Sequence, residues 1–302
     1  MPSYGTGREL PGPRYTSFIH GQHLQNVEIT GGGTIDGQGA YWWKLFESKN
    51  LKHTRGRLIE FMWTNHVLIH NIHLQNSPFW TVHPVYCDDV TVRNVSIKNP
   101  ASSPNTDGVD PDSSTNVLIE NCTIDVGDDM IAIKSGMNEA GVKYGRPSGN
   151  MTIRNNLFLN GHGASIGSEM SGGVFNITFD NNIFKNTERG CRIKTEADRG
   201  GYVKNVIFKN MVINNVKEVI SVSMFYGFDT TSQGQRDDKA MALPLPIFED
   251  FTFSNLTAND CESAGQIQCL EGSPCTELNL EDIHIGAKTG FTCGYAFGKY
   301  RD

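Results

Sequence analysis

The sequence predicts an all-β chain of a single domain, wound as a parallel β-helix. Three observations carry this prediction. One short motif recurs along most of the 302 residues, its apolar residues alternate as they do in β-strands, and successive copies share one polar position.

The recurring motif reads apolar, any, apolar, any, Asn, apolar, any, apolar. Its copies are spaced by 23, 27, 34, 26, 29, 45 and 27 residues and begin at Val67, Val90, Val117, Met151, Ile177, Val206, Phe251 and Leu278. A partial copy begins at Val27. The alternation predicts strands with one buried face, and the period of 23 to 34 residues is expected to hold no helical segment, as is typical of stacked β-coils. We expect each copy to be one turn of the solenoid.

The fifth position of the motif is polar in every full copy: Asn71, Asn94, Asn121, Asn155, Asn181, Asn210, Asn255 and Asp282. We expect these side chains to stack in a buried row, because stacked amides hydrogen-bond to one another and to the turn backbone.

Three segments depart from the repeat. The step of 45 residues predicts an inserted loop at about 226–246, outside the coil stack. Aromatic residues at 41–47 predict a short helix or an aromatic excursion. About 25 residues precede the first coil and show no convincing cap, which is consistent with an N-terminal truncation.

Composition narrows the class of protein. The net charge of −7 argues against nucleic acid as the main partner, and no apolar run approaches the roughly 18 residues of a membrane span. The start of the chain as given lacks the features of a signal peptide. The seven cysteines have no CxxC spacing, so zinc is not expected. The last four predict one or two disulfides near the C-terminus: Cys261, Cys269, Cys275 and Cys293.

Side chains of catalytic type fall at similar positions of four consecutive coils. Counted from the start of each copy, the offsets are 17 for Asp107, 11 and 12 for Asp128 and Asp129, 11 for His162, and 15 and 17 for Arg192 and Lys194. Similar positions of successive coils lie on one face, so we expect these groups to converge. Three carboxylates, an imidazole and two cations suit acid–base hydrolysis of an acidic sugar.

Each cluster by itself has an ordinary structural interpretation. Asp128 and Asp129 follow a glycine, as in many turns, and His162 lies between two glycines of an expected loop. Arg192 and Lys194 fit a solvated strand face. The shared position on consecutive coils favours a functional site.

Four signatures resemble, in this order, those of the polygalacturonase family, glycoside hydrolase family 28: Asn105–Gly108 (NTDG), Gly127–Asp129 (GDD), Gly161–Gly163 (GHG) with Ser165–Ser168 (SIGS), and Arg192–Lys194 (RIK). The resemblance covers nearly the whole chain. It implies a right-handed, pectin-lyase-like parallel β-helix and hydrolysis by single displacement with inversion, without a metal or other cofactor.

The resemblance also implies roles for individual residues. Asp128 is similar to the general acid, while Asp107 and Asp129 correspond to the residues that position and activate water. His162 corresponds to the residue that supports the protonation state of the acid.

Binding roles follow in the same way. Arg192 and Lys194 correspond to residues that bind galacturonate carboxylates. Asn105 corresponds to a residue that orients the substrate or the acids.

Three further segments resemble a branch shared by bacterial exopolygalacturonases and many plant polygalacturonase-like proteins: Ser77–Pro84, Gly167–Gly173 and Arg199–Tyr202. This likeness favours cleavage at chain ends, and it makes His83, Arg199 and Tyr202 candidates for contact with the terminal sugar or for loop packing. Such an enzyme needs loops that close one end of its cleft, for which the candidates lie at 41–56, 136–147 and 226–246.

The sequence thus predicts an inverting hydrolase of α-1,4-galacturonosyl linkages in de-esterified pectin, with exo action favoured. The alternatives are a rhamnogalacturonan or xylogalacturonan hydrolase on the same fold, or a non-catalytic pectin-binding β-helix. The expected partner is an acidic polysaccharide, without nucleic acid or membrane, and we expect a monomer. The substrate implies an extracellular or periplasmic location, although the start of the chain as given leaves a cytoplasmic one open.

Overall fold

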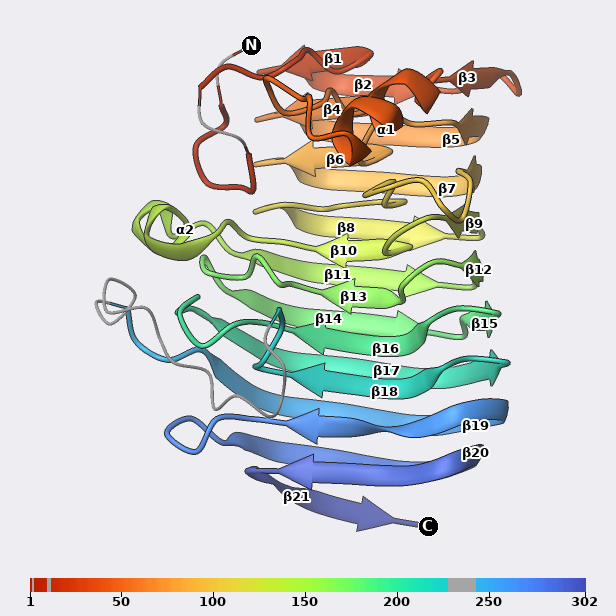
Figure 1. Ribbon diagram of the computed structural model, residues 1–302, viewed down its shortest axis with the longest axis vertical. Coiled ribbons are helices and arrows are strands. Elements are labelled where there is room, and N and C mark those ends of the chain that lie inside the picture. The colour runs from red at the N-terminus through yellow and green to blue at the C-terminus, as the bar shows by residue number, and fades with distance from the viewer. Residues whose placement is uncertain (2, 10–11, 228–242) are drawn as a thin grey trace.

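The parallel β-helix is confirmed by a computed structural model, which describes residues 1, 3–9, 12–227 and 243–302. The coils stack along one long axis, with the N-terminal coil at one end and the C-terminal coil at the other (Figure 1). All pairings between the named strands are parallel, as stacked coils require.

The strands form three faces. Face one contains β2 (Gln25–Ile29), the first parts of β5 (Asn65–Gln75) and β7 (Asp88–Lys98), β8 (Thr115–Glu120), β11 (Ser148–Arg154), β14 (Val174–Asp180), the first parts of β17 (Tyr202–Asn214), β19 (Ile247–Gln268) and β20 (Cys275–Gly294), and β21 (Ala296–Arg301). Face two contains β3 (Thr34–Asp36), the second parts of β5 and β7, β9 (Thr123–Val126), β12 (Leu157–Asn160), β15 (Ile183–Lys185) and the later part of β17. Face three contains β1 (Ile19–Gln22), β4 (Ile59–Met62), β6 (Val82–Val85), β10 (Ile131–Ile133), β13 (Ala164–Ile166), β16 (Arg189–Lys194) and β18 (Glu218–Ser223).

The strand register follows the sequence repeat. The first residues of all eight motif copies pair with one another in sequence along face one, from Val67 with Val90 to Phe251 with Leu278. The same stacking aligns buried aromatic rings: those of Phe179 and Phe208 lie 4.4 Å apart between centroids. Since one coil cannot bury its own apolar face, this pairing creates the core.

The predicted burial of the asparagine row was wrong. These asparagines are exposed, and they occupy left-handed conformations, with φ near 50° at Asn71 and Asn255, at the corner between faces one and two. Asparagine tolerates this conformation better than most residues. The side chains do stack, since Asn181 Nδ2 donates to Asn155 Oδ1 at 2.8 Å, but they do so on the outside.

The buried amides stand one residue later in the sequence. Asn156 and Asn182 have at most 2% of their surface exposed. The Asn182 Oδ1 accepts a hydrogen bond from the backbone N–H of Asn156 at 3.0 Å, and the Asn156 Oδ1 accepts one from Cys122 at 2.9 Å. They satisfy backbone donors at the turn, the role that we expected of their neighbours Asn155 and Asn181.

The described residues include two short helices outside the coils. The predicted helix at 41–47 is confirmed as α1 (Ala40–Glu47). The expected loop at 136–147 contains a second helix, α2 (Asn138–Tyr144), so the expectation that no helical segment separates the copies was wrong at this step. The helix ends at Gly145 in a left-handed conformation typical of a helix C-terminus. Of the predicted insertion at 226–246, residues 228–242 lie outside the described residues.

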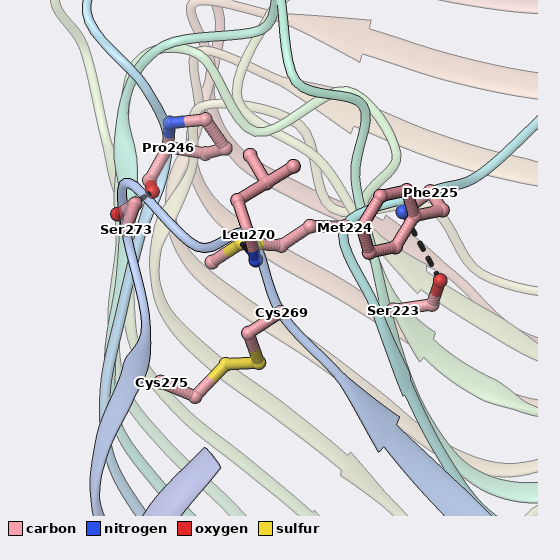
Figure 2. The surroundings of a disulfide bond; sticks show 8 residues. All are labelled: Ser223, Met224, Phe225, Pro246, Cys269, Leu270, Ser273 and Cys275. Atoms are coloured by element: carbon pink, nitrogen blue, oxygen red, sulfur yellow. Dashed lines mark hydrogen bonds between the residues drawn. A yellow bond between two sulfur atoms is a disulfide. The ribbon is translucent and has the colours of Figure 1, made fainter. Parts of the chain in front are cut away.

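One disulfide closes the turn between β19 and β20. It joins Cys269 to Cys275 (Figure 2), which confirms the prediction of one or two disulfides near the C-terminus. In the same turn, Ser273 Oγ donates to the carbonyl of Pro246 at 2.7 Å. Leu270 lies beside Met224, whose sulfur accepts from the Leu270 backbone N–H.

The N-terminal segment packs along face three. Arg14 Nη1 lies 2.7 Å from both carboxylate oxygens of Glu60 on β4. Tyr4 is buried, and its hydroxyl donates to Asp112 at 3.2 Å. No helix in the described parts of the chain has the length and apolar character that a membrane crossing requires.

Candidate active site

Face three brings three of the expected site residues into one row. Parallel bridges align three residues of consecutive coils: Val109, Ile131 and Ala164. Two positions before these residues stand Asp107, Asp129 and His162. The equal offset on paired strands places them at the same edge of face three, one coil apart.

The two expected cations reach this row from a different position. Arg192 and Lys194 lie within β16, where Arg192 pairs with Ser165 rather than with His162. Their long side chains extend back across a coil: Arg192 Nη1 is 3.0 Å and Lys194 Nζ is 2.6 Å from the carboxylate of Asp129. Similar sequence offset therefore predicted their proximity, while side-chain length produces the contact.

Asp129 is a buried, fully paired carboxylate. Its side chain is 1% exposed, and it also accepts a hydrogen bond of 2.7 Å from Ser165 Oγ. Burial alone would raise the pKa of Asp129, but Lys194 and Arg192 outweigh burial and hold that pKa well below its ordinary value. Asp129 is therefore ionised.

Asp128 is the most accessible of the three expected acids, with 19% of its side chain exposed. Its Oδ1 lies 3.0 Å from His162 Nδ1, and its Oδ2 lies 3.4 Å from Asn105 Nδ2. Burial acts to raise the pKa of Asp128, but the hydrogen bond with His162 prevails and lowers it. The same bond raises the pKa of His162. The pair thus shares one proton, held by the imidazole in the unliganded site.

The pKa of Asp107 is shifted upward, in contrast to those of Asp128 and Asp129. It is 3% exposed, and burial together with the charges of Asp110 and Asp128 raises its pKa well above the ordinary value. Asp110 is fully buried, and burial raises its pKa to about 7. Lys134 Nζ lies 3.6 Å from Asp110 Oδ1 and 3.0 Å from Glu169 Oε2. The carboxyls at this site therefore differ widely in proton affinity.

A cavity of about 490 Å³ is lined by the three expected acids and Lys194, but not by His162, Asp110 or Arg192. Its wall combines cations (Arg8, Lys49, Arg55, Lys134, Lys194), aromatic rings (Phe46, Phe79, Trp80, Tyr226), carboxyls (Glu9, Asp107, Asp128, Asp129, Glu169) and Asn105. Charged groups beside flat apolar surfaces are suited to a sugar ring that carries a carboxylate.

A second cavity, of about 320 Å³, lies on the other side of His162. It is lined largely by amides and acids, among them Asn186, Asn215, Glu188 and Glu262. Its lysine, Lys217, is already paired with Glu188 at 2.9 Å. The second cavity therefore offers mainly neutral and acidic groups to a ligand.

The structure places the three candidates for terminal-sugar contact outside the 490 Å³ cavity. His83 is fully buried between Glu60 and Asp112, with its ring nitrogens 3.1 and 3.5 Å from their carboxylates. Arg199 is 1% exposed, and it donates to Asn138 on α2. The ring of Tyr202 packs against Gly173. These positions correspond to the loop-packing interpretation.

Several residues of the cavity were missed by the sequence analysis. Tyr226 lines it beside Lys194, whose Nζ lies 4.8 Å from the ring centroid. Lys134, which lines the cavity, follows the GDD signature by five residues, and its partner Asp110 follows the NTDG signature by two. This closeness to known signatures is the signal that could have found them. For Arg8 and Arg55 the sequence offers no such signal, because they belong to segments outside the repeat.

One group of possible metal ligands lies within the described residues, formed by Asp128, Asp129 and His162. Asp129 is already neutralised by a lysine and an arginine, and His162 Nδ1 is engaged by Asp128. The arrangement suits proton transfer, because its carboxyls and imidazole are coupled by hydrogen bonds and differ in pKa.

Proteins with similar sequences are named as polygalacturonases. The family described as "Glycosyl hydrolases family 28" matches residues 7–299. A probable polygalacturonase of Vitis vinifera is 39% identical over 293 residues, 95% of this chain and 58% of that protein. An endo-polygalacturonase of Pectobacterium carotovorum subsp. carotovorum is 34% identical over 255 residues, 80% of this chain and 58% of that protein. The chain spans a little more than half the length of these relatives.

Solved structures give the same picture of the fold. An exopolygalacturonase from Thermotoga maritima superposes with a TM-score of 0.86 at 31% identity, covering 98% of this chain and 72% of that one. A polygalacturonase from Erwinia carotovora ssp. carotovora gives a TM-score of 0.80 at 30% identity, covering 99% and 77%. The similar proteins thus include both exo- and endo-acting enzymes by name.

Proposed function

The chain belongs to glycosyl hydrolases family 28, and from this we propose that it hydrolyses α-1,4-galacturonosyl linkages in de-esterified polygalacturonate, with inversion and from chain ends. The observation that carries the proposal is the arrangement of three carboxyls on one cavity wall. Asp128 is accessible and hydrogen-bonded to His162, whereas Asp107 and Asp129 are buried with opposite shifts in pKa.

Asp128 is the proposed general acid. A proton donor must touch the glycosidic oxygen, and the exposure of Asp128 supports that role over its more buried neighbours. A bound uronate displaces water and adds negative charge, and both effects raise the pKa of Asp128. Asp128 then takes the proton held by His162 and transfers it to the leaving oxygen as the C1–O bond breaks.

The water that attacks C1 needs a partner on the opposite side. Asp129, ionised by its contacts with Lys194 and Arg192, and Asp107, whose burial increases its affinity for protons, line the same cavity. Asp129, which is ionised, takes up one of the water's protons as the new C1–O bond forms, and Asp107 orients the water. Attack from the face opposite the leaving group inverts the anomeric configuration.

The shape of the cavity supports action at chain ends. Segments outside the coils contribute to its wall, including Phe46, Lys49 and Leu51 of the 41–56 excursion and Arg8 and Glu9 of the N-terminal segment. The Arg8 backbone N–H donates to Glu169 at 2.8 Å, which fixes this segment against the cavity. A cavity walled by several such segments accepts an end of a polymer more readily than its middle.

The proposal also covers the ligand, the oligomeric state and the location of the protein. The ligand is an acidic polysaccharide or oligogalacturonate, recognised through Arg192 and through Lys194 and the other cations that line the cavity. The protein acts as a monomer in the extracellular or periplasmic space, where pectin is found.

The test is release of reducing ends from de-esterified polygalacturonate at about pH 5, with products separated by length over time. Monomer at the earliest points supports exo action, and NMR of the first product distinguishes inversion from retention. A ladder of oligomers overturns exo action but keeps the reaction. Absence of release by the folded protein overturns the substrate assignment, and xylogalacturonan, rhamnogalacturonan and simple binding are then measured in turn.

A further inference from the structure

Arg55 is a buried cation beside the proposed catalytic acid. It has 2% of its surface exposed, and its direct partners are uncharged: Nη1 donates to the carbonyls of Pro78 and Pro104, both at 2.9 Å. Among the residues that the structure describes, no carboxylate forms an ion pair with it. Burial lowers the pKa of Arg55 to about 10. An arginine held this way is costly to stability, which points to a functional role.

Two aromatic rings hold the guanidinium in place. Its central carbon lies 4.4 Å from the ring centroid of Phe46 and 4.7 Å from that of Phe79. Such cation–π contacts fix the plane of the group without neutralising it. Phe46 belongs to α1, so the excursion that interrupts the repeat supplies one of these rings.

The contact that matters is with Asn105. Arg55 Nη2 donates to Asn105 Oδ1 at 2.9 Å. Because a guanidinium only donates hydrogen bonds, the amide oxygen must face Arg55 and the amide nitrogen must face the other way. The nitrogen then lies 3.4 Å from Asp128 Oδ2. A flipped amide would set donor against donor at Arg55 and acceptor against acceptor at Asp128.

Asp128 is thereby held at both oxygens. His162 contacts Oδ1, and Asn105 contacts Oδ2. Asn105 itself has a left-handed backbone, with φ of 55°, and the carbonyl before it belongs to Pro104, which Arg55 also binds. Arg55 therefore fixes both the turn and the side chain that contact the carboxyl.

We propose that Arg55 is a positioning residue for the reaction: it locks the amide of Asn105 in the orientation that holds Asp128 toward the cavity. The inference rests on the proposed function for its kinetic consequences. It extends that function by giving the 41–56 excursion, through Phe46, a part in aligning the acid.

Two substitutions of Arg55 separate the effect of its planar geometry from the effect of its charge. Arg55→Lys keeps the charge but loses the planar fork, so we expect kcat on oligogalacturonate to fall about tenfold or more, with KM changed much less. The limb of the pH–rate profile set by Asp128 should stay near its wild-type position. Arg55→Gln also removes the charge that favours the Asp128 carboxylate, so that limb should move to higher pH as well.

Asn105→Asp provides an independent route to the same result. An aspartate still accepts from Arg55 but donates nothing to Asp128, so kcat should fall as in Arg55→Lys. Combined with Arg55→Lys, it should add little further loss, because both changes break one relay. Additive losses in the double variant would overturn the relay.

Arg146→Lys is the matched control. Arg146 donates to the carbonyl of Cys87 at 3.4 Å, and its guanidinium lies 5.7 Å from the Tyr86 ring, outside the cavity. Arg146→Lys should leave kcat and the pH profile unchanged. Wild-type kcat and pH profile in folded Arg55→Lys would overturn the proposal.

A measurement without substrate keeps this inference separate from the proposed function. The Asp128 carboxyl is titrated by NMR in 13C-labelled protein, with its signal identified by comparison with Asp128→Asn. We expect its pKa to rise in Arg55→Gln. If the wild type releases no sugar but this rise occurs, the substrate assignment fails and the positioning role stands. The same change in an Asn105→Ala background should raise the pKa by less, because the part that passes through the Asn105 amide is already lost. An unchanged titration, or a rise of equal size in that background, overturns the role whether or not the protein is active.

Discussion

His162 and Asp128 stabilise each other's charged forms across a hydrogen bond of 3.0 Å between Nδ1 and Oδ1. The bond raises the pKa of His162 and, against the effect of burial, lowers that of Asp128. One proton thus resides between an accessible carboxyl and an imidazole, at the point where the two cavities approach each other. This relationship makes both stability and activity depend on pH.

Removing the imidazole should change the pH dependence of stability. Asp128, with its lowered pKa, contributes stability that is lost as pH falls through that value, and His162 contributes stability that is lost as pH rises through its raised pKa. The loss of Tm in His162→Gln should therefore be largest between these two values and shrink on both sides. Thermal melts across pH measure this.

The control for the thermal melts of His162→Gln is a second histidine–carboxylate pair. His66 and Asp89 form an exposed pair on the solenoid surface, with more than half of each side chain accessible. His66→Gln should change Tm little at any pH, because water screens such a pair. A flat pH dependence in His162→Gln would contradict the ion pair described above.

Asp128→Asn should separate binding from chemistry. An amide keeps the size of the side chain but cannot transfer the proton, so we expect kcat to fall by roughly 10²–10⁴-fold. Binding of oligogalacturonate, followed by calorimetry, should persist, since the cations of the cavity remain. Asp89→Asn, at an exposed position away from the cavity, should have wild-type kcat. Substantial activity in Asp128→Asn would move the role of acid to Asp107.

Breaking the buried contact between Lys194 and Asp129 should be costly to stability. Lys194→Met leaves the carboxylate with Arg192 and the hydroxyl of Ser165, and removal of one member of a buried pair costs about 3–5 kcal/mol. The remaining arginine should keep the loss near the low end of that range. Denaturant unfolding measures it.

A second change tests whether that loss comes from an unpaired charge. Asp129→Asn in the Lys194→Met background removes the uncompensated carboxylate, so the double variant should recover part of the stability. Purely additive losses would mean that Lys194 acts through packing, for which Tyr226 is the neighbouring surface.

The disulfide at the last coils should contribute to stability but not to catalysis. Cys269 and Cys275 are six residues apart, and closing so short a loop stabilises by about 2 kcal/mol in the chain-entropy account. Replacing both by serine should lower the free energy of unfolding by about that amount, with faster hydrogen exchange at β20. The value of kcat should stay at the wild-type level. A large loss of activity would show that this turn supports Tyr226 through Met224, which lies beside Leu270 (Figure 2).

The fold was predictable because its determinants are local and repeated. Each motif copy encodes its own strand through alternation, and stacking identical patterns leaves one register in which Val67, Val90 and Val117 all face the core. The expected proximity of Asp107, Asp129 and His162 followed from the same repeat, since all three stand two residues before positions that pair between consecutive coils.

Other features depended on where side chains point and how far they reach. The asparagine row is exposed because its backbone is left-handed at the corner, a property that alternation does not encode. His83 lies between two carboxylates of neighbouring coils and does not line the cavity, although its segment resembles one from exo-acting proteins.

The sequence by itself determined the solenoid, its register and the edge at which the expected acids meet, because a β-helix converts spacing along the chain directly into position. Only the tertiary structure decided which of those acids are protonated and which side chains contact them. Asp129 is ionised because two side chains reach it across a coil, and Arg55 reaches Asn105 because segments outside the repeat fold back on the site. Such contacts depend on the paths of the loops and on burial, and the sequence repeat determines neither.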